Sequence, residues 1–190
     1  MAIDASTYSP YLCDRLIKKM IVMKKIGIFY GSSSGNTQTI AEQIAKSLGV
    51  DKEDVYDIGK TSIDKISCYD CLLLGSSTWG FGDIQDDWDL SKLEKLNLRG
   101  KKAAIFGTGD SSSYPDTFCD AIGQLAESVE KAGALLVGNK VDSSDYSFDS
   151  SVSENNGFFC GLAIDEVNEP EKTDSRITEW TKQLHLDFEL

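Results

Sequence analysis

The sequence has little histidine, few prolines and a shortage of basic residues. Its single histidine, His185, lies close to the C-terminus, which argues against histidine-based catalysis and against a zinc site. No apolar run approaches the roughly 18 residues that a membrane-spanning helix needs. The apolar run at 21–23 is too short for a secretory signal and lies between lysine pairs. We therefore expect a cytoplasmic protein that does not enter a membrane.

The cysteines do not indicate a disulfide framework. There are five of them, an odd number, in a chain of 190 residues that is long enough to bury a core without such bridges. Cys68 and Cys71 have the spacing of a redox pair, but they lie at the entry to a predicted strand, without the helix start that lowers the pKa of a thiol. We interpret both as structural residues in a reducing compartment.

The charge is strongly acidic. Nineteen Lys and Arg residues stand against 31 Asp and Glu residues, for a net charge of −12 at pH 7. Such a protein repels the phosphates of nucleic acid and of anionic membranes, so we expect neither as a partner. It attracts basic protein surfaces. The same balance also occurs in ordinary acidic proteins, so charge alone leaves the function open.

The chain divides into a short N-terminal segment and one domain. Met23 is followed directly by two lysines and an apolar strand, as at a natural protein start. We therefore predict that residues 1–22 form an N-terminal extension, either flexible or not native to the protein. Residues 23–190 then form a single folded domain.

Strand and helix patterns alternate along this domain. Apolar runs predict strands at Ile26–Tyr30, Val55–Ile58, Cys71–Leu74, Ala103–Phe106 and Ala134–Val137. Helical patterns lie at Thr37–Leu48, Ser62–Ile66, Leu90–Leu96, Thr117–Lys131 and Ser175–Leu186. The alternation indicates an α/β fold: a doubly wound, five-stranded parallel sheet with helices on both faces, in three layers.

Residues 138–157 interrupt this alternation because they are polar and rich in Ser, Asp and Asn. A loop of about twenty residues inside a compact domain requires an explanation. The apolar residues that follow indicate an insertion that interrupts the last strand, which is expected to resume at Phe158.

The segment Gly31–Thr37, here called the phosphate loop, joins the first strand to a helix. In such sheets ligands bind at the carboxyl ends of strands, and a helix start offers free N–H groups to a phosphate. Four residues of the loop carry hydroxyls and none is Lys or Arg. The loop predicts binding of one terminal phosphate by neutral donors. The alternative is a Ser/Gly-rich turn that only caps the helix.

Two further loops each carry an aromatic residue after a predicted strand. The first aromatic loop, Gly75–Gly82, contains Trp79, and the second aromatic loop, Gly107–Pro115, contains Tyr114. Because the carboxyl ends of parallel strands meet at one edge, these rings are placed to enclose a flat ring system between them. Trp88 and Trp180, at predicted helical positions, are instead expected to be packing residues.

Together these three segments resemble the flavodoxin family. The phosphate loop is similar to the family pattern T-x-T-G-x-T, with Ser32 and Ser34 at threonine positions and Thr37 retained. The two aromatic loops, with their continuations to Trp88 and Gly123, resemble the flavin loops of the family. The insertion and the apolar segment after it match the long-chain subgroup, and the resemblance covers residues 23–190.

The resemblance implies a flavodoxin-like sheet with strand order 2-1-3-4-5 and FMN as the cofactor. It implies that Trp79 covers the inner flavin face and Tyr114 the outer face. The cofactor-binding residues that it implies are Ser32, Ser33, Ser34, Gly35, Asn36, Thr37, Ser77, Thr78, Trp79, Gly80, Phe81, Gly82, Gly107, Thr108, Gly109, Asp110, Tyr114, Asp116 and Phe118.

The implied function is that of a low-potential one-electron carrier rather than an enzyme. Its implied partners are a flavodoxin reductase and low-potential oxidoreductases with basic docking surfaces, and we expect a monomer. Excess acidic charge disfavours the negative charge gained on full reduction of the flavin. Gly80 tolerates a positive φ, which lowers the cost of turning a peptide carbonyl toward the half-reduced flavin.

Two other functions stay open at this point. An FMN-dependent quinone or nitro reductase of the same fold would need room for a substrate above the flavin, which Tyr114 beside Trp79 would fill. A phospho-acceptor signalling domain of the same topology would need clustered carboxylates at the end of the first strand, where this chain has Ser and Gly.

Overall fold

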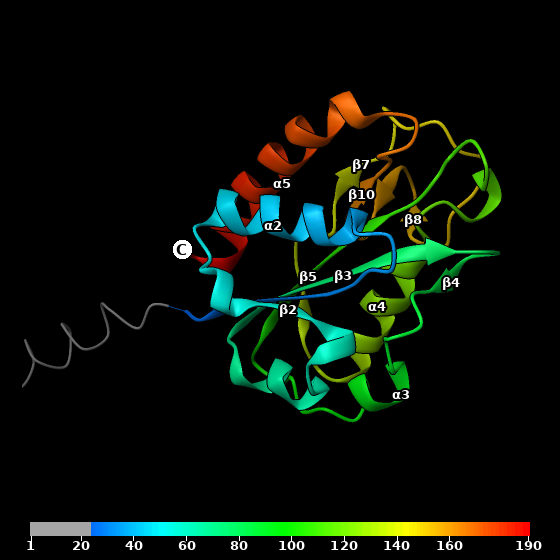
Figure 1. Cartoon of the computed structure of the whole chain (residues 1–190). Coiled ribbons are helices and arrows are strands. Elements are labelled where there is room, and N and C mark those ends of the chain that lie inside the picture. The colour runs from blue at the N-terminus through cyan, green and yellow to red at the C-terminus, as the bar shows by residue number, and fades with distance from the viewer. Residues whose placement is uncertain (1–23) are drawn as a thin grey trace, which may run out of the picture.

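The computed structural model describes residues 24–190, so the predictions for residues 1–22 lie outside the described part. The central sheet has the strand order β2-β1-β3-β5-β10, and β6 pairs with the beginning of β5 (Figure 1). These strands are β1 Ile26–Gly31, β2 Val55–Asp57, β3 Cys71–Trp79, β5 Lys102–Thr108, β6 Leu135–Leu136 and β10 Leu162–Ile164. With β6 and β10 as two parts of one strand, the predicted order 2-1-3-4-5 is confirmed.

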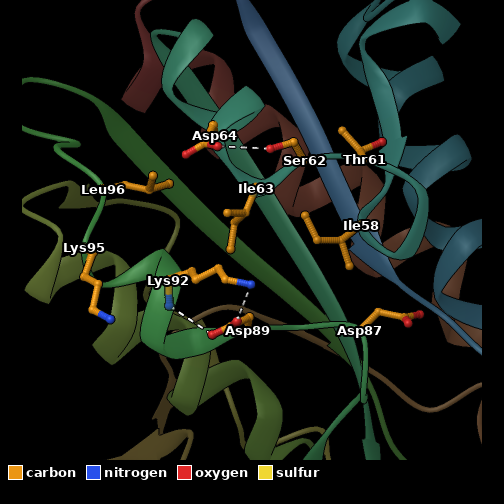
Figure 2. A pocket seen from close by; sticks show the side chains of 10 residues that line it. All are labelled: Ile58, Thr61, Ser62, Ile63, Asp64, Asp87, Asp89, Lys92, Lys95 and Leu96. Atoms are coloured by element: carbon orange, nitrogen blue, oxygen red, sulfur yellow. Dashed lines mark hydrogen bonds and ion pairs between the residues drawn. The ribbon is translucent and has the colours of Figure 1, made fainter.

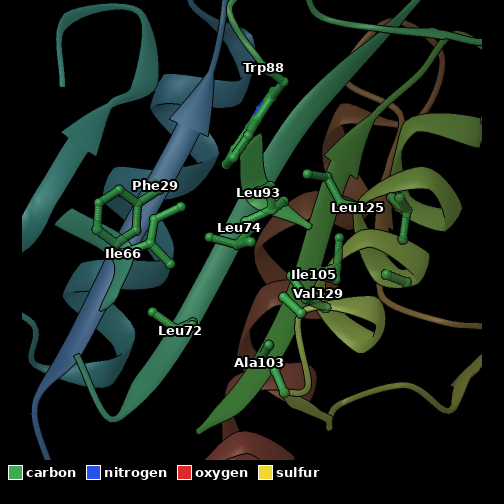
Figure 3. Close-up of a cluster of buried hydrophobic side chains, with 14 of the residues drawn as sticks. Phe29, Ile66, Leu72, Leu74, Trp88, Leu93, Ala103, Ile105, Leu125 and Val129 are labelled. Carbon is green, nitrogen blue, oxygen red and sulfur yellow. The ribbon is translucent and has the colours of Figure 1, made fainter. Parts of the chain in front are cut away.

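Helices cover both faces of the sheet (Figure 1). They are α2 Asn36–Leu48, α3 Leu90–Leu93, α4 Asp120–Lys131 and α5 Thr173–Phe188. Successive strand residues point to opposite faces. Ile28 and Leu73 therefore belong to the core shared with α2 and α5, whereas Phe29 and Leu74 belong to the core on the side of α4 (Figure 3). The apolar runs of the strands are buried on both faces, which confirms the three-layer prediction.

The last strand is interrupted, but it does not resume at Phe158 as predicted. Phe158 and Phe159 form β9 (Phe158–Phe159), which pairs antiparallel with both β7 (Val141–Asp142) and β8 (Glu154–Asn155) in a small separate sheet. Phe159 is fully buried among the aromatic rings of the insertion, and this packing outweighs pairing with the main sheet. The main sheet resumes at Leu162, opposite Phe106.

Several predicted boundaries also move. β3 extends five residues beyond Leu74 because β4 (Asp83–Ile84) folds back and pairs with its end. The predicted helix at 62–66 is a 3₁₀-helix, Ile63–Cys68. The helix predicted from Thr117 begins at Asp120, after a short 3₁₀ turn at Pro115–Thr117. Trp88 precedes α3 rather than lying in a helix, but it and Trp180 are both buried, as predicted.

Candidate functional site

The phosphate loop and both aromatic loops start side by side at one edge of the sheet. Gly31 of β1 lies opposite Ser76 of β3, and Ser76 lies opposite Gly107 of β5. The three strands are parallel, so the loops that follow them leave the sheet in the same direction. The structure thus brings together the three segments on which the sequence prediction of a site depends.

The phosphate loop leaves the start of α2 open. Gly35 precedes the helix with φ +96°, and no side chain in the described structure caps the helix. The first N–H groups of a helix lack intrahelical partners, so those of α2 are free for a ligand. Ser33, Ser34 and Asn36 are exposed around them, and Ser32 instead accepts a hydrogen bond from the Gly35 amide at 3.1 Å.

Thr37 does not face the surface. Its side chain is fully buried, and its hydroxyl lies 3.1 Å from the hydroxyl of Thr108 at the end of β5. This hydrogen bond ties the phosphate loop to the second aromatic loop. Gln85, which is also buried, donates a hydrogen bond to the Ser33 hydroxyl at 3.2 Å and so makes a second contact with the phosphate loop. Gln85 is polar, so nothing in the sequence predicted that it would be buried beside the phosphate loop.

The first aromatic loop is a tight turn between β3 and β4. The Gly82 amide donates to the Trp79 carbonyl at 3.0 Å, and Gly80 and Gly82 have φ values of +49° and +102°. The indole N–H of Trp79 donates to the hydroxyl of Ser77 at 2.7 Å, which orients the ring. Trp79 is 48% exposed and Phe81 is 93% exposed. The turn therefore presents one half-exposed ring and one almost fully exposed ring.

The second aromatic loop presents Tyr114 in the same way, with 48% of the residue exposed. Its turn is built around Asp110, whose carboxylate accepts the amides of Ser112 at 3.1 Å and Ser113 at 2.9 Å. The Asp110 carbonyl accepts the Tyr114 amide at 2.9 Å. Burial raises the pKa of Asp110, but hydrogen bonds from Asn168 and Ser113 outweigh burial, so its pKa lies below the ordinary value.

The insertion supports the second aromatic loop from outside. The amides of Asp149 and Ser150 both donate to the Pro115 carbonyl, and the Ser150 hydroxyl donates to the Asp116 carbonyl at 2.6 Å. Asp116 itself is exposed. Phe118 is 1% exposed and packs against aromatic residues of the insertion, so it can support the site only from beneath. No sequence signal linked the insertion to this loop.

The described residues also form hollows away from these loops. One of about 500 Å³ lies between the segment Ile58–Asp64 and α3, with Lys92 paired to Asp89 at its edge (Figure 2). A groove of about 1430 Å³ runs between β7 and α5. Neither is lined by a residue of the phosphate loop or the aromatic loops. The site predicted from the sequence is instead the sheet edge at which the three loops begin, with aromatic rings exposed on two of them.

Three other features of the described part of the chain concern metal ligands, membrane-spanning helices and cysteines. Residues 24–190 hold no gathering of three or more potential metal ligands. Among the helices that the structure describes, none combines the length and the apolar character needed to cross a membrane. Cys68, Cys71, Cys119 and Cys160 are all free thiols. Burial raises the pKa of Cys71, which agrees with a structural role for that thiol.

Comparison with known proteins assigns the family. A family model described as flavodoxin matches residues 28–180. Flavodoxin 1 of Escherichia coli K12 is 45% identical over 168 residues, which cover 85% of this chain and 95% of that protein. The flavodoxin of Synechocystis sp. PCC 6803 is 42% identical over 165 residues, which cover 85% of this chain and 96% of that protein.

Solved structures agree with this assignment. The crystal structure of Fusobacterium nucleatum flavodoxin bound to flavin mononucleotide superimposes with a TM-score of 0.80 at 31% identity, covering 87% of this chain and 99% of that chain. Oxidised flavodoxin 2 of Bacillus cereus has a TM-score of 0.67 at 29% identity, covering 86% and 99%. The chain therefore belongs to the flavodoxin family, and its length is that of the long-chain type.

Proposed function

We propose that this protein carries single electrons between redox proteins on one non-covalently bound FMN. The observation that carries the proposal is the convergence of an uncapped helix start with two half-exposed aromatic rings at one edge of the sheet. FMN has one terminal phosphate and one flat ring system, and we match the phosphate to the open helix start and the ring system to the two aromatic rings. Bound flavin supplies the chemistry by accepting and releasing electrons one at a time.

The donors of the phosphate loop suit a terminal phosphate. An ideal Cβ at Gly35 would meet nothing within 4 Å, so the approach to the helix start is open. The free N–H groups of α2, aided by the helix dipole, compensate the phosphate charge without a cation. In this role we place Ser32, Ser33, Ser34, Gly35 and Asn36, with Thr37 holding the loop from beneath.

The rings and small residues of the aromatic loops suit the flavin. We place Trp79 and Tyr114 on its two faces, with the remaining loop residues at its edge: Ser77, Thr78, Gly80, Phe81, Gly82, Gly107, Thr108, Gly109, Asp110 and Asp116. Offset stacking of aromatic rings contributes about 0.5–1.5 kcal/mol per pair beyond burial of their area. Phe118, being buried, acts through packing.

The charges on and behind the three loops favour a low potential. Neither aromatic loop contains Lys or Arg, and the phosphate loop has none. Asp110 and Asp165, whose pKa values lie below the ordinary value, stay ionised at neutral pH. Negative charge added to the flavin on full reduction is therefore opposed by nearby carboxylates and is not neutralised by a cation.

The family implies redox protein partners, and we propose that their basic surfaces dock beside the two aromatic loops. Phe81 is 93% exposed in the first aromatic loop, Asp83 and Asp86 are exposed in the residues that follow that loop, and Asp116 is exposed just after the second aromatic loop. Exposed carboxylates attract a basic partner, and an exposed ring can then contact it directly. We further propose that the protein acts as a monomer in the cytoplasm.

The test is a visible spectrum recorded during stepwise anaerobic reduction of the full chain supplied with FMN. A yellow protein that turns blue at half reduction and then bleaches would support the proposal. Failure to bind FMN, or bleaching without a blue form, would contradict it. Steady turnover of a quinone with NADPH would instead favour the reductase alternative.

A further inference from the structure

A buried carboxylate lies directly behind the second aromatic loop. Asp165 follows β10 and has no exposed surface. One of its oxygens accepts the Ser111 amide of the second aromatic loop at 3.0 Å. The other accepts the amides of Val167 at 3.1 Å and Asn168 at 3.0 Å. Asp165 thus joins the end of the last strand to the loop that presents Tyr114.

Asn168 bridges this carboxylate to a second one. Its side-chain amide donates to both oxygens of Asp165, at 3.0 and 2.9 Å, and to Asp110 at 3.0 Å. A buried carboxylate without donors would be strongly destabilising. Here burial raises the pKa of Asp165, but hydrogen bonds from Ser111 and Asn168 outweigh burial and hold its pKa below the ordinary value. The carboxylate is therefore kept ionised by N–H donors rather than by a cation.

Residues 111–114 of the second aromatic loop are held mainly through their backbone, while the insertion holds the loop at Pro115. Ser112, Ser113 and Tyr114 are exposed, so their side chains add little packing. Their backbone is held by Asp110, which accepts two amides, and by Asp165, which accepts the Ser111 amide. Both carboxylates also accept a hydrogen bond from the side-chain amide of Asn168. Loss of that amide would leave two negative charges facing each other without a shared donor.

We propose that Asp165, bridged by Asn168, is a positioning residue that holds the second aromatic loop ready for FMN before the cofactor binds. This inference rests on the proposed function, because it assigns the loop to the flavin. A loop ordered in advance loses less conformational freedom on binding, so the affinity for FMN is higher. The buried charge of Asp165 also adds to the field that opposes full reduction of the flavin.

The test compares three variants of the full-length chain. Asn168→Ala removes the bridge, and Asp165→Asn removes the buried charge. Asp149→Asn is the matched control, because Asp149 is an exposed carboxylate beside the same loop whose side chain makes no hydrogen bond with the described residues. Hydrogen exchange of the Ser111 amide is measured without FMN, and the FMN dissociation constant by fluorescence titration.

We expect Asn168→Ala and Asp165→Asn to speed exchange of the Ser111 amide and to raise the dissociation constant of FMN about ten-fold, because a loop that is less ordered beforehand loses more conformational freedom on binding. Asp149→Asn should change neither quantity. Asp165→Asn should also shift the lower of the two midpoint potentials upward by more than Asp149→Asn does, because exposed charges are screened. A loss of structure alone does not predict this difference in potential.

The inference is overturned if both variants bind FMN as tightly as Asp149→Asn does. It is also overturned if Ser111 exchange is unchanged in Asn168→Ala, the milder variant, which keeps the backbone donors of Asp165. If the unaltered protein binds no FMN, the proposed function fails instead. Exchange in the FMN-free protein then still decides whether Asp165 and Asn168 hold the loop.

Discussion

The hydrogen bond between Thr37 and Thr108 offers a sharp test of how the site is held together. The two hydroxyls lie 3.1 Å apart, Thr37 is fully buried and Thr108 is 6% exposed. Thr37→Val keeps the shape of the side chain but removes its hydroxyl, so the Thr108 hydroxyl loses its partner. An unsatisfied buried polar group costs about 1–3 kcal/mol, and we expect the free energy of unfolding to fall by this amount.

The same reasoning predicts that the two positions are coupled. Thr108→Val should cost a similar amount, because it leaves the Thr37 hydroxyl unsatisfied. In the double variant both hydroxyls are replaced by apolar groups of the same shape, which is nearly neutral in comparable cases. We therefore expect the double variant to lose at least about 1 kcal/mol less than the sum of the single variants.

Urea unfolding of the FMN-free protein measures these quantities. FMN must be absent, because a ligand that binds only the folded state adds its own contribution to the apparent stability. The slope with urea should be the same in all four proteins, since the surface exposed on unfolding does not change. Single-variant effects that add up to within about 0.5 kcal/mol in the double variant would refute the coupling of the two loops.

Three further predictions concern separate parts of the domain. Ser153→Ala removes a hydroxyl that accepts an amide near the start of α4 at 2.7 Å, and should lower the free energy of unfolding by about 1 kcal/mol in urea. Gly80→Val strains a backbone with φ +49° and should shift both midpoint potentials in a redox titration; unchanged potentials would contradict the assignment. Glu189, bound by Lys102 and Lys24, has its pKa lowered from 4.5 to about 2. Its stabilisation is present above pH 4.5 and is lost as the pH falls through 2, so Glu189→Gln should lower the free energy of unfolding at pH 7 and by progressively less as the pH falls toward 2.

The strands of the main sheet were predictable because a strand buried on both faces is a continuous apolar run in the sequence. A run such as Cys71–Leu74 is apolar throughout, and a strand of this kind can lie only between two layers of helices. The short strands have no such sequence pattern. β4, β7, β8 and β9 have two residues each, too few to show a period, and only tertiary pairing defines them.

The site residues also differ in how far they could be predicted from the sequence. The segments that form the candidate site were predictable, because Gly and Ser at a helix start and aromatic residues after strands have a direct chemical meaning. The bonds that hold them were not. From the sequence alone Thr37 is expected to be a surface donor, and only the structure shows its buried partner Thr108. From the sequence alone Asp165 is one acidic residue among many, and only the structure places Ser111 and Asn168 around it.

The first turn of α4 explains why the insertion bears on the site at all. Cys119, at the start of α4, has φ +57° and provides no side-chain cap, and the Ser153 hydroxyl of the insertion accepts the Gly123 amide of the first turn. The same turn holds the first aromatic loop, since the Gln124 side chain donates to the Gly82 carbonyl at 2.6 Å. Asp120 accepts the Val152 amide of the insertion at 2.8 Å. A change in the insertion therefore reaches the first aromatic loop through α4 and the second through Pro115, so its effect on the site does not require contact with the cofactor.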